Sequence, residues 1–354
     1  MTDPTPSEPD AVLPRQSRLA GDVLQRWGPL IALAVLVLAV SVYDWARHGE
    51  FVFLSPANVI NVLHNWSFVG IIAVGMTFVI IAGGIDLSVG SLVAFAGGLA
   101  IWLMNRAIAG GWPEGAAVVL AGAVAIATGT LAGLLNGAIV TQGRVAPFIA
   151  TLGGLAAYRS LALTLADGGE FRSASPTWFA TLGNQGIPLP MLTNRYGNPL
   201  VLPWPVLVFA GVALAGWVVL TRTRYGRYVY AIGCNELAAR YSAVRVDRVK
   251  ALTYTLVGGL TGLAALLNAS RMNSVSSGNS ALMWELDAIA AVVIGGTRMA
   301  GGAGSIRGTV VGLLLLGVIA NMLNLLQVSP YLQGLVKGTI IVAAVLVQRG
   351  RRAD

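Results

Sequence analysis

The feature that most constrains this chain is a series of long stretches without any Asp, Glu, Lys or Arg. One runs from Phe51 to Ile85, and another separates Arg26 from Asp44. A helix needs about 20 mostly apolar residues to cross the hydrocarbon core of a bilayer. Only 11% of the residues are charged, whereas an ordinary soluble domain has about 25%. These observations exclude a soluble enzyme, a nucleic-acid-binding domain and a disordered protein.

The stretches predict an all-α polytopic membrane protein with about ten membrane-spanning helices. The expected ranges are 27–43, 66–83, 87–104, 116–140, 147–165, 203–221, 250–268, 285–297, 308–326 and 331–348. The eighth range is short, but without it the basic C-terminal end would lie on the opposite side of the membrane from the N-terminus. With both termini in the cytoplasm, the cytoplasmic loops hold most of the Lys and Arg residues, as the positive-inside rule requires.

The segments outside the spans predict the domain organisation. Residues 1–26 are polar and rich in proline, and we expect a disordered cytoplasmic tail because they lack the basic start and apolar run of a signal peptide. Residues 27–348 form the expected transmembrane domain, and residues 349–354 form a basic cytoplasmic tail. The longest cytoplasmic loop is 222–249. The longest external segment, 166–202, is rich in the turn formers Gly and Pro.

Several kinds of chemistry are excluded by what the sequence lacks. The chain has one cysteine, Cys234, and two histidines, His48 and His64, so no metal site built from such ligands is expected. It has no G-x-x-x-x-G-K-[ST] loop, which means that the chain is not expected to bind and hydrolyse ATP itself. We therefore expect no catalytic residue, no metal and no cofactor in this chain.

Glycines recur at a spacing of four within or near several predicted helices. Small residues on one helix face let backbones approach closely in lipid, where the hydrophobic effect does not drive helix association. The spacing predicts close packing of helices or subunits, and the alternative is that glycine is simply frequent in membrane helices. The glycines concerned are Gly129, Gly133, Gly137, Gly258, Gly262, Gly304, Gly308 and Gly312.

A carboxylate lies between two predicted helices, in the stretch 83–90. A charged group at this depth is costly and is a functional hypothesis by default. Asp86 can cap the helix that follows it. It can also take part, with Ser88, in gating or in the substrate path, or it can carry a proton. The residues alone leave these three alternatives open.

Two further polar groups lie near the C-terminal end. Glu285 and Asp287 begin the short predicted helix 285–297, where we expect them at the surface. Amide side chains can bind sugar hydroxyl groups because they both donate and accept hydrogen bonds, or they can join neighbouring helices. At a spacing of three, such side chains are expected to lie along one stripe in the outer half of the predicted helix 308–326: Asn321, Asn324 and Gln327.

The middle of the cytoplasmic loop, residues 235–243, predicts a short helix with basic flanks. Such a helix can dock into a groove on a partner protein. It can also serve as a positive-inside anchor or lie on anionic lipid.

Four segments together resemble one protein family. They are IIAGGIDLSVGS (80–91), AIGCNELAARYSAV (231–244), ELDAIAAVVIGGTRMAGGAGSIRGTVVG (285–312) and NMLNLLQVSPYLQGLVKGTIIVAAVLV (321–347). The combination resembles the membrane permease of bacterial ABC importers for monosaccharides, the group that contains the ribose and xylose permeases. The resemblance covers residues 60–348.

The resemblance implies a set of partners in the bacterial inner membrane. These are a second permease copy, a cytoplasmic ATPase that uses ATP and Mg, and a periplasmic sugar-binding protein, with no nucleic acid. It also implies that one part of the loop contacts the ATPase: Asn235, Glu236, Ala238, Ala239, Arg240 and Ser242. Residues expected along the translocation path or its gate are Asp86, Ser88, Asn321, Asn324 and Gln327.

Two other readings remain. A proton-coupled secondary transporter would use the charges of Asp86, Glu285, Asp287 and Lys337. An ABC permease for a solute other than a sugar would share the architecture. The proposed mechanism for the importer is alternating access, driven by ATP binding to the partner ATPase.

Overall fold

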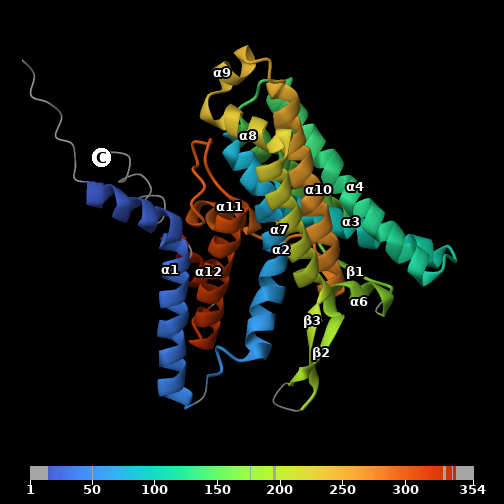
Figure 1. Ribbon diagram of the computed structural model, residues 1–354. Helices are drawn as coiled ribbons and strands as arrows, with labels where there is room; N and C mark the ends of the chain where they lie inside the picture. Colours follow the sequence, from blue (N-terminus) through green and yellow to red (C-terminus); the bar gives the residue numbers. More distant parts are fainter. Residues whose placement is uncertain are drawn as a thin grey trace, which may run out of the picture.

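The computed structural model describes residues 15–49, 51–175, 177–193, 197–329, 332–336 and 338–339. Eight helices in these ranges are long and apolar enough to cross a membrane, and Figure 1 shows them packed into one bundle. They are α1 (Arg15–His48), α2 (Pro56–Ile81), α3 (Val89–Ala109), α4 (Glu114–Thr141), α5 (Pro147–Leu165), α7 (Trp204–Arg222), α10 (Val246–Met272) and α12 (Ile306–Leu325). The prediction of an all-α polytopic membrane protein is confirmed.

The shorter elements lie mainly between these helices and at the two ends of the bundle. They are β1 (Glu170–Arg172), α6 (Trp178–Asn184), β2 (Gly186–Thr193), β3 (Pro199–Pro203), α8 (Arg224–Cys234), α9 (Glu236–Tyr241), β4 (Ser274–Ser276) and α11 (Trp284–Ile294). Strand β1 pairs antiparallel with β4, and β2 pairs antiparallel with β3. In Figure 1, α8 and α9 lie at one end of the bundle and the β2–β3 hairpin lies at the opposite end. We call these the α9 end and the hairpin end.

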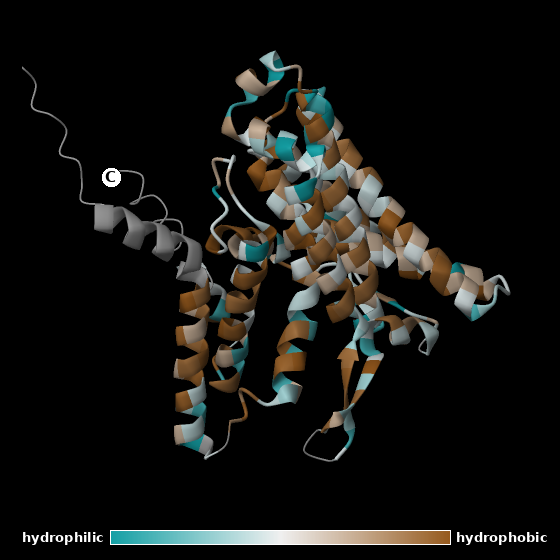
Figure 2. Ribbon diagram, in the orientation of Figure 1, coloured by the Kyte–Doolittle hydropathy of each residue, from teal (hydrophilic) through white to brown (hydrophobic). Residues whose placement is uncertain are grey.

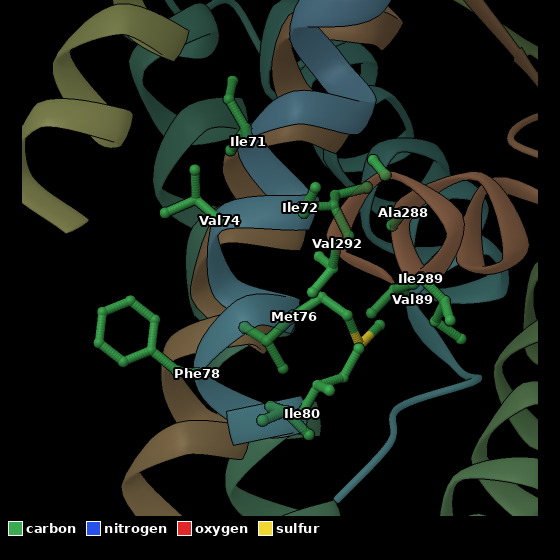
Figure 3. Close-up of a cluster of buried hydrophobic side chains, with 14 of the residues drawn as sticks. Ile71, Ile72, Val74, Met76, Phe78, Ile80, Val89, Ala288, Ile289 and Val292 are labelled. Carbon is green, nitrogen blue, oxygen red and sulfur yellow. The ribbon is translucent and has the colours of Figure 1, made fainter. Parts of the chain in front are cut away.

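Helix α2 forms the centre of the bundle. In its apolar segment 89% of the residues are buried, against 17% for α1 at the edge. A helix that is apolar all round is typical of such a buried position. Figure 3 shows Ile72 and Met76 of α2 close to Val292 of α11, with Val89 of α3 nearby. Figure 2 shows apolar residues along the bundle helices and hydrophilic residues at the α9 end.

Local signals explain where α2 begins. The side chain of Ser55 accepts a hydrogen bond from the Asn58 N–H at 3.3 Å, and a proline occupies the first turn. Both features favour a helix start. The predicted start of this helix at residue 66 was therefore ten residues too late, because the first turns are more polar than a membrane-spanning segment and were read as a loop.

The predicted close packing of glycine-bearing helices is confirmed. Helices α4 and α10 touch backbone to backbone: a Cβ added at Gly129 would collide with the Gly258 carbonyl oxygen, and one at Gly137 would lie 2.9 Å from the Ala251 Cα. Helices α11 and α12 meet in the same way, since a Cβ at Gly312 would collide with the Ala291 carbonyl oxygen. Close approach of backbones is how small residues hold membrane helices together.

The prediction of a membrane-spanning helix at 285–297 is wrong. Helix α11 has 11 residues and is about 16 Å long, roughly half the hydrocarbon thickness. The chain before α11 consists of β4 and the non-helical segment 277–283. Irregular backbone at membrane depth must be satisfied by the protein itself. Arg159 does this, because its Nη1 donates to the carbonyl oxygens of Ser277 at 2.9 Å and Ser280 at 3.2 Å.

The ends of the chain differ from the prediction or fall outside the description. Helix α1 begins at Arg15, so the helical part starts earlier than the predicted tail boundary at residue 26. The predicted helix 331–348 lies mostly outside the described residues, as do Lys337 and the tail 349–354. The placement of both termini in the cytoplasm stays a prediction.

Candidate functional site

The first candidate site is the α8–α9 unit at one end of the bundle. The N-cap of helix α8 is Thr223, whose side chain accepts a hydrogen bond from the Gly226 N–H at 3.3 Å. The N-cap of helix α9 is Asn235, whose side chain accepts a hydrogen bond from the Ala238 N–H at 3.0 Å. Asn235 is therefore the cap that separates two short helices, which confirms the predicted helix in the middle of the loop 222–249.

Ion pairs connect α9 to the first two turns of α10. The Lys250 Nζ lies 2.5 Å from a Glu236 carboxylate oxygen, and this hydrogen bond lowers the pKa of the Glu236 carboxyl below its ordinary value. The Arg240 guanidinium meets both Asp247 oxygens, at 3.1 and 2.9 Å, and also Glu236 at 3.3 Å. A single exposed pair adds at most about 1 kcal/mol, but the linked pairs orient α9. Arg240 is thus engaged within the chain.

The exposed face of α9 is apolar at its centre. Leu237 is 67% exposed and Tyr241 is 90% exposed, and a spacing of four places both side chains on the same face of a helix. Ala239, which the resemblance implied as a contact residue, is only 5% exposed and packs into the main core. A partner at this surface would therefore meet Leu237 and Tyr241. The i, i+4 spacing of these two residues is visible in the sequence, but they were not among the predicted contact residues.

The second candidate site is a buried polar cluster where α3 begins. Asp86 is 1% exposed and Ser88 is completely buried. One Asp86 oxygen accepts hydrogen bonds from the Ser88 N–H at 2.8 Å and the Ser88 hydroxyl at 2.6 Å. The Asn136 amide of α4 donates to the Ser88 hydroxyl at 2.9 Å, and the Tyr158 hydroxyl of α5 donates to the Asn136 oxygen at 3.3 Å.

This cluster differs from the predicted helix cap in one respect. The N-cap of α3 is Ser88, and Asp86 lies two residues earlier, where its carboxylate holds the Ser88 N–H in a local turn. The sequence analysis did not identify Asn136 or Tyr158, because their helices α4 and α5 meet α3 only in the folded protein. The cluster joins three helices through one hydrogen-bonded chain.

The cluster lies at membrane depth. The Tyr254 hydroxyl donates to the Ile85 carbonyl oxygen at 3.4 Å, and Tyr254 is about 12 Å along α10 from its first residue, Val246. A cavity of about 10 Å³ beside this segment is lined partly by Gly84, Lys250 and Tyr254. Such a volume holds at most one water molecule.

The three amide residues that the sequence analysis grouped, Asn321, Asn324 and Gln327, have different surroundings in the structure. Asn321 exchanges two hydrogen bonds with Asn58 of α2, at 2.9 and 3.0 Å. Of the two predicted roles for this amide, sugar binding and the joining of neighbouring helices, the structure shows the second. Helix α12 ends at Leu325, so Gln327 lies beyond the helix, where its backbone has a φ of 54°. Asn324 is exposed and accepts a hydrogen bond from Gln333 at 2.9 Å. The predicted continuous stripe of three amides on one helix is wrong.

The acidic pair at the start of α11 faces the protein more than expected. Glu285 is partly buried and lies against α3, since a Cβ at Gly90 would collide with its carboxylate. Asp287 follows in the same first turn of α11. Glu285 therefore contacts α3 and keeps only part of its expected exposure at the surface. Among the residues that the structure describes, no group of three His, Cys, Asp or Glu side chains could hold a metal ion.

Comparison of the sequence with known proteins shows the family to which this chain belongs. Residues 58–345 match the family described as the permease component of a branched-chain amino acid transport system. The chain is a member of this permease family. The permease is 40% identical to the ribose import permease protein RbsC of Bacillus subtilis (strain 168), over 96% of this chain and 97% of that protein. It is 40% identical to RbsC of Escherichia coli (strain K12), over 91% and 93%. It is 32% identical to the xylose transport system permease protein XylH of the same strain, over 98% of each.

Membership confirms the predicted class of protein. The permease is a multi-pass protein of the bacterial inner membrane and a transport subunit, not an enzyme. A permease component belongs to a larger transport system, which implies a separate ATPase subunit and a substrate-binding protein.

Proposed function

We propose that the permease imports a monosaccharide, a ribose-like pentose or a hexose, as the membrane subunit of an ABC importer. The observation that carries this proposal is 40% identity to ribose import permeases over almost the whole chain, together with similarity to a xylose permease. A partner ATPase binds ATP and Mg and supplies the energy. The permease itself contributes the path through the membrane.

The α8–α9 unit is the proposed docking site for the ATPase. The exposed Leu237 and Tyr241 form an apolar face on a short helix, which suits insertion into a groove on a partner. Glu236 and Arg240 hold this helix against α10, and Asn235, Ala238 and Ser242 complete the exposed surface. The α9 end then faces the cytoplasm and the hairpin end faces the periplasm, where a binding protein delivers the sugar to two permease copies.

The proposed mechanism is alternating access. A ligand shifts a conformational equilibrium only when it binds the two states with different affinity, and here that ligand is ATP, acting through the ATPase on α9. The buried polar cluster around Asp86 and Ser88 is a proposed gate in this cycle. Path roles for Asn321, Asn324 and Gln327 stay predictions, and the pairing of Asn321 with Asn58 favours a structural role for that residue.

Transport by the reconstituted complex tests the function. Proteoliposomes that hold the permease and its ATPase, with the binding protein outside, are expected to take up a monosaccharide only when ATP is present inside. Uptake should survive an uncoupler. Uptake driven by a proton gradient without any ATPase would instead support the secondary transporter, with Asp86, Glu285, Asp287 and Lys337 as its candidate charges. A sugar panel separates sugars from other solutes.

Variants of α9 test the docking site. Leu237→Asp places a charge in the apolar face, and we expect about tenfold less ATPase to co-purify, a loss typical of a central interface residue. Leu237→Met is the control that keeps the face apolar. Arg240→Glu sets an acid beside Asp247 and Glu236, and it should displace α9 and reduce co-purification or uncouple hydrolysis while the permease still inserts. Normal complex formation and transport in both charge variants would contradict the docking assignment.

A further inference from the structure

Three segments far apart in the sequence meet at one point beneath the α8–α9 unit. They are the last residue of α2, the last turn of α8, and the loop 295–305 that joins α11 to α12. In Figure 1 this loop rises from α11 toward α8. The Gly302 N–H donates to the Ile81 carbonyl oxygen at 2.9 Å. Because α2 ends at Ile81, this carbonyl has no partner within its own helix, and the loop supplies one.

Glycine is required at this meeting point, which we call the glycine junction and define as Ile81, Gly233, Gly301 and Gly302. A Cβ at Gly233 would collide with both the Ile81 carbonyl oxygen and the Gly302 nitrogen. Gly301 and Gly302 have φ values of 87° and 74°, in the region that favours glycine. Backbone therefore lies directly against backbone, without a side chain that could yield when one segment moves.

A further contact closes the junction on the side of α8. The Tyr230 hydroxyl donates to the Gly304 carbonyl oxygen at 2.8 Å. Within the loop, the Arg298 N–H donates to the Ala303 carbonyl oxygen at 2.9 Å, which holds the two halves of the loop together. The loop is thus attached to α8 by a side chain and to α2 by its backbone.

The junction is also close in sequence to the buried polar cluster. From Ile81 the chain passes through Gly83, whose nitrogen would lie 3.1 Å from a Cβ at Gly301, and reaches Asp86 and Ser88. A displacement of α8 is transmitted through rigid packed backbone, since tightly packed interiors transmit strain. Asp86 and Ser88 follow Ile81 by only five and seven residues, so a displacement of the end of α2 is passed to the polar cluster through a short stretch of chain.

We propose that Gly233, Gly301 and Gly302 are positioning residues that make the α8–α9 unit and the end of α2 move together, so that ATPase action reaches the polar cluster. This inference rests on the proposed function, in which α9 receives the ATPase. It assigns a role in coupling to the glycine-rich loop after α11, outside the loop 222–249.

Two alanine variants separate close approach from backbone strain. Gly233 lies within α8 and has an ordinary helical backbone, so Gly233→Ala disturbs only the contact with Ile81 and Gly302. Gly296 lies in the same loop but outside the junction, with a φ of 92° and open space around its Cβ position. Gly296→Ala therefore strains the loop without touching the junction.

The measurement is the number of sugar molecules transported per ATP hydrolysed by the complete complex in proteoliposomes. We expect Gly233→Ala to lower this ratio about tenfold, a usual size of coupling between sites, while the ATPase still co-purifies. Gly296→Ala should keep the ratio within about twofold of the wild type. A wild-type ratio for Gly233→Ala, or an equal loss for Gly296→Ala, overturns the proposal.

A milder variant decides the question if Gly233→Ala does not fold. Tyr230→Phe removes only the hydroxyl that bonds to Gly304, and we expect the ratio to fall about threefold, the effect of one lost hydrogen bond. Tyr228→Phe, on the same helix and 41% exposed, is the matched control. An unchanged ratio for Tyr230→Phe then overturns the proposal. Failure of the proposed function itself is visible separately, because the wild-type permease would then show no ATP-driven uptake.

Discussion

The side chains of Asn58 and Asn321 exchange two hydrogen bonds between α2 and α12, at 2.9 and 3.0 Å. Each amide both donates and accepts, so the pair uses the bonding capacity that amides offer. We expect Asn321→Ala to lower the free energy of unfolding by about 1 kcal/mol, a usual value for a hydrogen bond between membrane helices. Denaturant unfolding of the purified permease in detergent measures this change.

A double-mutant cycle provides the control for the amide pair. Asn58→Ala and the combined variant complete the cycle, and the two losses should not add, because the second substitution removes a partner already lost. Asn324→Ala, at an exposed position of the same helix, should change stability by less than about 0.5 kcal/mol. Strictly additive losses would show that the two residues do not interact.

Asp86→Asn keeps an oxygen that can accept the hydrogen bonds from the Ser88 N–H and hydroxyl. We therefore expect the variant to fold and to transport at a rate within about threefold of the wild type, as for a single altered hydrogen bond. Asp86→Ala leaves the buried Ser88 N–H without this acceptor and should cost about 1–3 kcal/mol of stability. Uptake assays and unfolding measurements on both variants separate the roles. A folded Asp86→Asn permease without transport would show that the negative charge is needed.

Gly129→Ala should destabilise the bundle. The added methyl group would collide with the Gly258 backbone in α10, and forcing extra atoms into a packed interior costs typically about 1–3 kcal/mol. Gly211→Ala in α7 is the matched control, because nothing lies within 4 Å of its Cβ position. In that control the better helix propensity of alanine should raise stability by up to about 1 kcal/mol. Equal effects of the two substitutions would contradict the packing of α4 against α10.

The position of α9 should depend on pH only in acid. The hydrogen bond from Lys250 lowers the folded-state pKa of Glu236 below its ordinary value of 4.5. Stabilisation by this pair is therefore fully present above pH 4.5 and is lost as the pH falls through the lowered pKa. A spin label at Ser242→Cys in a Cys234→Ser background reports the mobility of α9, which should rise only below about pH 4.5.

The control for the pH experiment removes the carboxylate. In Glu236→Gln the label should be more mobile than in the wild type at neutral pH, and the rise in acid should be smaller. A label whose mobility is the same in both proteins at every pH would show that the Glu236–Lys250 pair does not hold α9 in place.

Hydropathy alone determined the class of protein and most of its membrane helices. The long uncharged stretches have no other stable environment than a bilayer, and an isolated chain in lipid must satisfy its backbone within a helix. The spacing of Gly129, Gly133 and Gly137 also predicted close packing. Residues four apart lie on one face of a helix, so this pattern can be recognised without knowing which helix packs against it. The α9 helix was equally visible, since its cap Asn235 and its sequence are local.

Only the tertiary structure decided which polar groups meet. Asp86 and Ser88 were visible in the sequence, but their partners Asn136 and Tyr158 lie on α4 and α5 and come close only after folding. The shortness of the helix at 285–297 was visible in the sequence, but the contact by which Arg159 of a distant helix satisfies the irregular backbone before α11 was not. The Ile81–Gly302 contact likewise joins residues that are 221 positions apart in the sequence. Periodicity reports on one helix at a time, whereas these contacts depend on how helices are placed against each other.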